Sequence, residues 1–129
     1  MIDPQPSTVN GDLVSAWLSA RAERDLDRVA SLTTADAIWH SPVEGRRIGR
    51  AAVIEEIRRA FENTDRFETA LVSLRCQSTT AEAQIRNVAT RHGKSLDSVQ
   101  TLSFRVENGQ IAEIHVQVDD QAQVEDFWR

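Results

Sequence analysis

The chain has 129 residues, the size of one ordinary domain, so the sequence predicts one hydrophobic core rather than two. Hydrophobic residues make up 40% and charged residues 27%, a globular composition that excludes disorder as the main state. The formal net charge of -5 argues against a surface that binds phosphates, so we expect no nucleic-acid partner. The single Cys76 and the three scattered histidines lack the spacing of a zinc site, and we expect no metal and no other cofactor.

The N-terminal segment MIDPQPSTVNGD has acidic residues and prolines where a secretory signal would have basic residues and then an apolar run. We therefore expect a cytoplasmic protein. No stretch approaches the ~18 apolar residues that cross a bilayer, so we expect no membrane partner. Pro4, Pro6 and Ser7 indicate a flexible arm over residues 1–8, followed by a single domain over residues 9–129.

The first half of the domain has mainly helical periodicity. Apolar residues recur at helical spacing over residues 11–24 and again over the shorter segment 26–32. Residues 50–63 carry one apolar stripe with most charged side chains off it, which is the strongest helical pattern in the chain. Between these helices, residues 36–41 alternate and residues 45–49 return after a turn, which predicts a small β-hairpin.

The second half changes to a period of two, which predicts a long antiparallel sheet. Its four strands follow one another as a meander over residues 67–77, 81–92, 96–107 and 111–118. Val124, Phe127 and Trp128 then indicate a short closing helix or an apolar tail. Helices first and a sheet afterwards is the pattern of an α+β fold.

The register of the last two strands depends on the turn that contains Gly109. A two-residue turn would place Phe104 and Leu102 on the same side as the charged residues of the next strand. A three-residue loop with a left-handed Gly109 instead places Phe104 beside Ala112 and Leu102 beside Ile114. Because the second register makes one apolar face, the sequence predicts the three-residue loop.

The same alternation assigns an inner face to the two preceding strands. We expect the inner row of the first to be Ala70, Val72, Leu74 and Cys76, and that of the second to be Ala83, Ile85, Asn87 and Ala89. Asn87 is then the polar residue of an otherwise apolar row.

The order of elements resembles the nuclear transport factor 2-like superfamily, most closely its SnoaL-like and ketosteroid-isomerase-like branches. The resemblance rests on ADAIWHSP at residues 35–42, IGRAAV at 48–53 and ENGQI at 107–111. It implies a curved antiparallel sheet wrapped around a long helix to form a cone, with a ligand pocket inside. It also implies a homodimer built on the outer face of the sheet.

The resemblance further implies that the usual catalytic groups of these relatives are missing. The carboxylate base, the tyrosine and the protonated aspartate of ketosteroid isomerases correspond here to Ser41, Trp17 and Leu102. The Asp-Arg-Asp set of limonene epoxide hydrolases corresponds to Asn87, Ile85 and Val116, and the aspartate base of SnoaL-type cyclases also falls near Val116. We therefore leave the catalytic residues unknown.

The predicted ligand-binding residues share the inner face of the cone and are uncharged: Trp17, Trp39, Ser41, Asn87, Gln100, Leu102, Ile114 and Val116. Each aromatic residue among them is equally explained by core packing, and Asn87 by a structural hydrogen-bond network. Such walls favour an uncharged, hydrophobic ligand, unless Arg91 turns inward and favours an anion.

The leading interpretation is a small-molecule-binding protein, an isomerase or cyclase of a neutral polyketide- or terpenoid-like substrate. The alternative is a non-catalytic ligand-binding or dimerisation module, which the missing carboxylates favour. A third hypothesis uses His40 as a general base, although its position in the strand alternation predicts that it points away from the pocket. We expect a homodimer through the outer row Thr101, Ser103, Glu113, His115 and Gln117.

Overall fold

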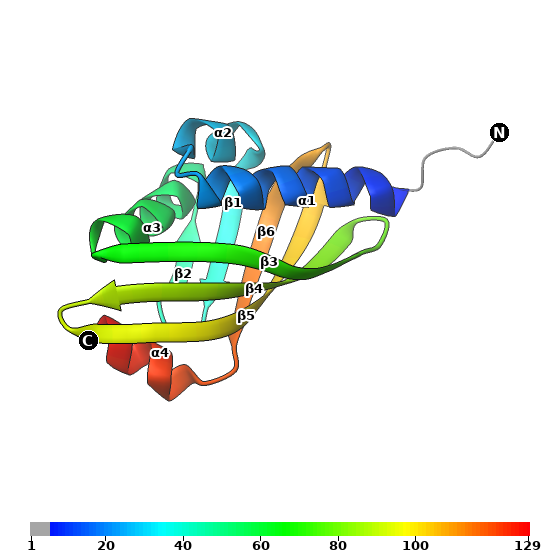
Figure 1. Cartoon of the computed structure of the whole chain (residues 1–129). Helices are drawn as coiled ribbons and strands as arrows, with labels where there is room; N and C mark the ends of the chain where they lie inside the picture. The colour runs from blue at the N-terminus through cyan, green and yellow to red at the C-terminus, as the bar shows by residue number, and fades with distance from the viewer. Residues whose placement is uncertain (1–5) are drawn as a thin grey trace.

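The computed structural model describes residues 6–129, with side chains from Asn10 onward. These residues form an α+β fold of four helices and one curved six-stranded sheet, as predicted (Figure 1). The elements in chain order are α1 (Pro6–Ala22), α2 (Leu26–Ser31), β1 (Thr33–Ser41), β2 (Gly45–Ile48), α3 (Arg50–Glu62), β3 (Arg66–Cys76), β4 (Thr80–Arg91), β5 (Lys94–Glu107), β6 (Gln110–Val118) and α4 (Gln121–Trp128). The predicted arm is partly helical, because α1 begins at Pro6, and residues 1–5 of that arm lie outside the described residues.

The strands lie side by side in the order β2-β1-β6-β5-β4-β3. The meander from β3 to β6 is antiparallel, as predicted. The pair β1 and β6 is parallel and places His40 opposite His115, which corrects the expectation of a wholly antiparallel sheet. Since β2 is paired with one edge of β1, β6 pairs with the other edge. The direction in which β6 runs is set by the turns of the meander that precedes it.

Helix α1 lies across the sheet and packs mainly on β3 (Figure 1). Its end nearest the β3–β4 turn is fixed by Asn10, whose amide donates to the carbonyls of Gln77 at 2.8 Å and Ser78 at 2.6 Å. Apolar side chains from α1, α3 and the sheet meet in one buried core, which includes Val14, Trp17, Val53, Ile57, Ile85, Leu102, Phe104 and Ile114. This burial is the main favourable contribution to folding.

A β-bulge in β3 changes which residues face the core. The register of β3 against β4 shifts between Leu71 and Ser73, so the strand alternation reverses there. The prediction is therefore wrong for Ala70 and Val72, which are exposed, while Leu74 packs against the core as expected. The inner row of β4 is confirmed, because its alternate residues Ala83, Ile85, Asn87 and Ala89 are buried.

The β5–β6 turn also differs from its prediction, although the buried face is the predicted one. Asn108 and Gly109 form a two-residue turn with positive φ angles of 52° and 76°, so the three-residue loop is wrong. A bulge one pair further along then shifts the register and sets Phe104 opposite Ile114. The extra residue thus lies beside the turn rather than within it, and the apolar face is preserved.

Helix α4 closes one end of the sheet. The predicted closing segment is helical, and the side chain of Asp120 caps it by accepting from the backbone N–H of Gln123 at 3.0 Å. Its Val124 and Phe127 pack in a second buried cluster with residues of β3, β4 and β5. Within residues 6–129, every helix is too short or too polar to cross a membrane.

Candidate functional site: an internal cavity with ionisable side chains

A small cavity of about 30 Å³ lies between the sheet and helices α1, α3 and α4. It is lined by four of the predicted ligand-binding residues, namely Trp39, Asn87, Gln100 and Val116. It is also lined by three ionisable residues that the sequence did not predict, namely Arg21, Glu44 and Glu56. The expectation of a wall with only neutral polar groups is therefore wrong.

The other four predicted residues do not line this cavity. Leu102 and Ile114 belong to the apolar core beside it. Trp17 is fully buried in the same core, packs edge-on against Phe104 and donates its indole N–H to the Thr33 hydroxyl at 3.1 Å. Of the two explanations weighed for Trp17, core packing is the one that its contacts support.

Ser41 acts on the cavity indirectly, through the turn that follows β1. Its hydroxyl oxygen accepts from the backbone N–H groups of Val43 and Glu44, at 3.1 and 3.2 Å. The hydroxyl also donates to the Glu44 carboxylate. Ser41 therefore holds Glu44 in the orientation in which it borders the cavity.

Three buried polar atoms around the cavity have no hydrogen-bond partner within the described part of the chain. They are Nε of Arg21, Nε1 of Trp39 and Oδ1 of Asn87. Two are donors and one is an acceptor, and all three residues line the same cavity. Since an unpaired buried polar group costs about 1–3 kcal/mol, three such groups in residues that line one cavity indicate a site that a polar ligand or water completes.

Arg21 reaches the cavity from the last turn of α1. Its residue is only 6% exposed, its guanidinium donates to the Thr69 hydroxyl at 3.2 Å, and it lies 5.7 Å from the centre of the Phe67 ring. Burial lowers the pKa of Arg21 to about 10, and the negative charge of Glu44 opposes that shift. Arg21 therefore remains a cation at neutral pH.

Glu56 faces the same region from α3. Its pKa is raised, first by burial and then by the nearby charge of Glu44, while Arg47 opposes the shift through an ion pair at 3.2 Å. A carboxyl group whose pKa moves toward neutrality is suited to take up and release protons. The carboxyl groups that border this cavity thus come from the β1–β2 turn and from α3.

A second pocket of about 220 Å³ lies next to the small cavity. The two share Glu44, Glu56, Ala60 and Trp128, so these four side chains form the boundary between them. The outer pocket is large enough for several ligand atoms, whereas the inner cavity has room for about two waters. A ligand therefore has to place a small polar end inside and the rest of its structure outside.

The sequence held partial signals for the missed residues. Arg21 lies four positions after Trp17 and so on the same face of α1, but an arginine in the last turn of a helix is normally exposed. Glu56 precedes the buried Ile57, and the helical spacing of α3 predicts that it lies off the apolar stripe of that helix. The direction of both side chains depends on the sheet that packs against their helices.

Arg91 and His40 lie outside the cavity. Arg91 donates to the backbone carbonyls of Phe127 and Arg129 at the end of α4, at 3.3 and 3.1 Å. His40 points away from the core, as its alternation predicted, and contacts Glu113. Among the residues that line the cavity, Arg21 is therefore the basic one, and Glu44 and Glu56 are the acidic ones.

Comparisons with known proteins identify the family of this chain. A family model described as SnoaL-like domain matches residues 14–114. Bal32a, from a soil-derived mobile gene cassette, has 24% identity and a TM-score of 0.92 over 97% of this chain and 100% of that chain. A protein from Jannaschia sp. CCS1, assigned by name to the SnoaL-like polyketide cyclases, has 16% identity and a TM-score of 0.83 over 98% and 97%. TerC, co-crystallised with polyporic acid, has 15% identity and a TM-score of 0.81 over 92% and 97%.

The search of curated proteins finds no match. At identities this low the solved structures establish the fold, which they share with nuclear transport factor 2-like proteins. The family model adds a match in the sequence itself, and it covers most of the chain. The chain belongs to the SnoaL-like domain family and has the nuclear transport factor 2-like fold.

Proposed function

We propose that this chain is a small-molecule-binding protein that holds the polar end of an uncharged organic molecule in its internal cavity. The observation that carries the proposal is that three residues lining one cavity, Arg21, Trp39 and Asn87, each have a buried polar atom with no partner among the described residues. A carbonyl oxygen accepts from the arginine and indole N–H groups, and a hydroxyl or enol donates to the amide oxygen. A hydroxyketone or an enolised diketone offers both groups, whereas a simple lactone offers only the acceptor.

The charges around the cavity support a neutral ligand rather than an acid. Arg21 contributes one positive charge, whereas Glu44 and Glu56 contribute negative charge when ionised. A carboxylate ligand would be attracted by one group and repelled by two, besides losing its own hydration. We therefore propose an uncharged ligand, as predicted from the sequence. The reason is now the balance of charges around the cavity rather than an apolar wall.

We propose that the reaction is an isomerisation or cyclisation in which Glu56 transfers the proton. Its raised pKa suits a group that takes a proton from the carbon next to a carbonyl. Arg21 and Trp39 would stabilise the negative charge that develops on the carbonyl oxygen. A polyketide-like substrate is supported by the cyclase name of the Jannaschia relative.

The alternative is a non-catalytic ligand-binding or dimerisation module. The observation in its favour is the volume of the inner cavity, about 30 Å³, which is smaller than an ordinary ligand site. In that case the unpaired atoms bind ordered water and serve only to hold Trp39 and Asn87 in place.

Binding is tested by titrating ketones, lactones and matched carboxylic acids while recording tryptophan fluorescence, to which Trp39 and Trp128 should respond. We expect the neutral compound of each pair to bind more tightly. Arg21→Met and Asn87→Leu should weaken that binding by about tenfold or more, since each removes a buried polar partner. Arg28→Met, an exposed arginine on α2, is the matched control and should leave affinity unchanged. Tighter binding of the acids would overturn the neutral-ligand proposal.

Catalysis is tested by following the exchange of deuterium into the position next to the carbonyl of a bound ketone by NMR. We expect exchange above the buffer rate in the wild type and at the buffer rate in Glu56→Gln. Glu62→Gln, on the same helix and exposed, should retain wild-type exchange. Binding with no exchange in the wild type would favour the non-catalytic module.

We also propose a homodimer through the outer sheet face that contains Thr101, Ser103, Glu113, His115 and Gln117. Each of these residues is exposed or half-buried, which leaves polar surface available to a second copy. Light scattering should give twice the 14.5 kDa mass of one chain at micromolar concentration. The cytoplasmic location and the absence of a nucleic-acid partner stay predictions from the sequence.

A further inference from the structure

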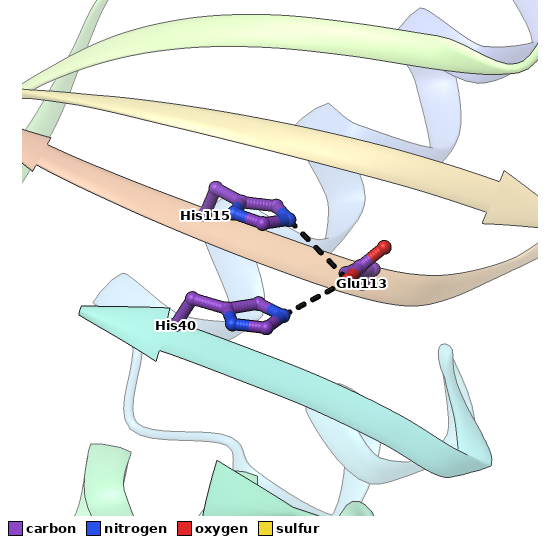
Figure 2. A group of neighbouring side chains, drawn as sticks. All are labelled: His40, Glu113 and His115. Carbon is purple, nitrogen blue, oxygen red and sulfur yellow. Dashed lines mark hydrogen bonds and ion pairs between the residues drawn. The ribbon is translucent and has the colours of Figure 1, made fainter. Parts of the chain in front are cut away.

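A cluster of two histidines and one glutamate lies on the face of the sheet opposite the core. His40 belongs to β1, and Glu113 and His115 belong to β6 (Figure 2). Trp39 and Ile114, their neighbours in the chain, are buried on the core side, so the cluster faces outward. It is separate from the cavity described above, which none of the three residues lines.

The three side chains converge on one point. Nε2 of His40 lies 2.9 Å from Oε2 of Glu113, and Nε2 of His115 lies 3.3 Å from the same oxygen (Figure 2). The two imidazole rings stack with their centres 4.1 Å apart and their planes 8° from parallel. One ligand atom from each residue lies within 4.8 Å of the others.

We propose that His40, Glu113 and His115 form a binding site for a divalent transition-metal ion such as Zn²⁺. Two imidazoles and one carboxylate are a ligand set that such ions bind in proteins, at about 2.0–2.2 Å. A tetrahedral ion with those bond lengths separates its ligand atoms by about 3.4 Å. The two nitrogen-to-carboxylate separations, 2.9 and 3.3 Å, are close to that value. The stacked imidazole rings are half-exposed or exposed and would tilt toward each other to direct both nitrogens at one ion.

The backbone fixes this arrangement before any ion binds. His40 and His115 are direct partners in the parallel pairing of β1 and β6, and Glu113 is two residues from His115 on the same face. Arg105 on β5 lies 3.3 Å from the other carboxylate oxygen of Glu113, which leaves Oε2 directed at the histidines. The positive charge of Arg105 is offset by Glu107, which it also binds at 2.9 Å. Such outer contacts orient the ligands of metal sites.

In the single chain the remaining coordination positions have access to solvent, whereas the homodimer proposed above would place a second copy over them, because Glu113 and His115 belong to its contact row. A surface cleft of about 360 Å³ borders the cluster and is lined by Glu113, His115 and Arg105, among others. Three protein ligands and an open position are typical of sites where the ion also holds a water molecule or a second ligand. The imidazoles favour Zn²⁺, Co²⁺ or Ni²⁺ over Mg²⁺ and Ca²⁺, which prefer oxygen ligands.

The sequence predicted no metal site because its histidines and acidic residues lack the spacing of a local motif. His40 and Glu113 are 73 positions apart, and only the parallel pairing of β1 and β6 brings them together. The inference does not depend on the proposed function of the internal cavity.

The test uses the whole chain, stripped of metal with a chelator and titrated with ZnCl₂ in a calorimeter. We expect one Zn²⁺ per chain, with binding weakened at least tenfold in His40→Ala, His115→Ala and Glu113→Gln. The control is His92→Asn, because His92 is exposed in the β4–β5 turn, outside the cluster, and asparagine tolerates its positive φ of 49°. Affinity in that variant should equal the wild type.

Two further readouts check that the effect belongs to the site. Co²⁺ should give the visible absorption bands of a four-coordinate ion in the wild type and in His92→Asn only. Saturating Zn²⁺ should raise the melting temperature of these two proteins and not that of the three cluster variants. Absence of Zn²⁺ binding at millimolar metal, or equal binding by wild type and all three cluster variants, would overturn the proposal.

Discussion

The indole N–H of Trp17 donates to the hydroxyl of Thr33 at 3.1 Å, and that hydroxyl donates in turn to the carbonyl of Val29 at 2.6 Å. All three residues are fully buried, so this short chain of hydrogen bonds joins α1, α2 and β1 without water. It assigns Trp17 to the core rather than to the ligand site. The neighbouring Thr34 differs from Thr33, because its buried hydroxyl has no partner among the described residues.

We predict opposite effects from the same substitution at these two threonines. Thr33→Val leaves the Trp17 N–H unpaired and should lower the free energy of unfolding by about 1–3 kcal/mol. Thr34→Val removes an unpaired hydroxyl and should leave that free energy equal or higher. Urea unfolding measures both, and equal destabilisation by the two changes would contradict the role given to the Trp17 hydrogen bond.

The raised pKa of Glu56 predicts a pH-dependent stability. Because the folded state binds this proton more tightly than the unfolded state, stability falls as pH rises from the ordinary glutamate range through the raised pKa. Glu56→Gln cannot ionise and lacks this loss. The free energy of unfolding of Glu56→Gln minus that of the wild type should therefore be larger at about pH 7 than at about pH 4.

Chemical unfolding at the two pH values checks this expectation, with Glu62→Gln as the control. Glu62 lies on the same helix but is 55% exposed in an ion pair with Arg58, so its substitution should not reproduce the pH-dependent gain. A gain of equal size in both variants would mean that the burial of Glu56 is not its cause.

Arg91 should matter for the end of α4 and not for ligand binding. It donates to two carbonyls there, and its guanidinium lies 6.0 Å from the centre of the Trp128 ring. Arg91→Ala should destabilise the protein by about 1–2 kcal/mol and increase hydrogen exchange of the α4 amides. The exposed Arg66→Ala is the control, since surface ion pairs contribute little. Unchanged exchange in α4 would contradict this role.

Two glycines should respond oppositely to alanine. Gly11 lies within α1, and an added Cβ would meet the Cys76 sulfur at an ordinary contact distance of 3.5 Å. Gly11→Ala should therefore stabilise the protein by about 0.4–1 kcal/mol. Gly109 has a φ of 76° in the β5–β6 turn, so alanine there should destabilise it by about 1 kcal/mol, although no atom obstructs the Cβ. Thermal unfolding of both variants measures the difference.

The sequence by itself determined the elements and most of the buried faces. The helix predicted over residues 50–63 is present as Arg50–Glu62, and the four predicted meander strands are present, because periods of 3.6 and 2 follow directly from backbone geometry. The inner row of β4 was predicted for the same reason, and so were four residues of the cavity wall, namely Trp39, Asn87, Gln100 and Val116.

The tertiary structure decided the features that the hydrophobic periodicity of the sequence does not encode. The bulges beside Val72 and Val106 depend on how neighbouring strands fit, and they reversed the predicted face of part of β3 and relocated the extra residue of the β5–β6 turn. The parallel pairing of β1 with β6 brought His40 to Glu113. The direction of Arg21 and Glu56 into the cavity was likewise decided by the sheet that packs against their helices. A long polar side chain has many conformers, and its surroundings in the fold select one of them.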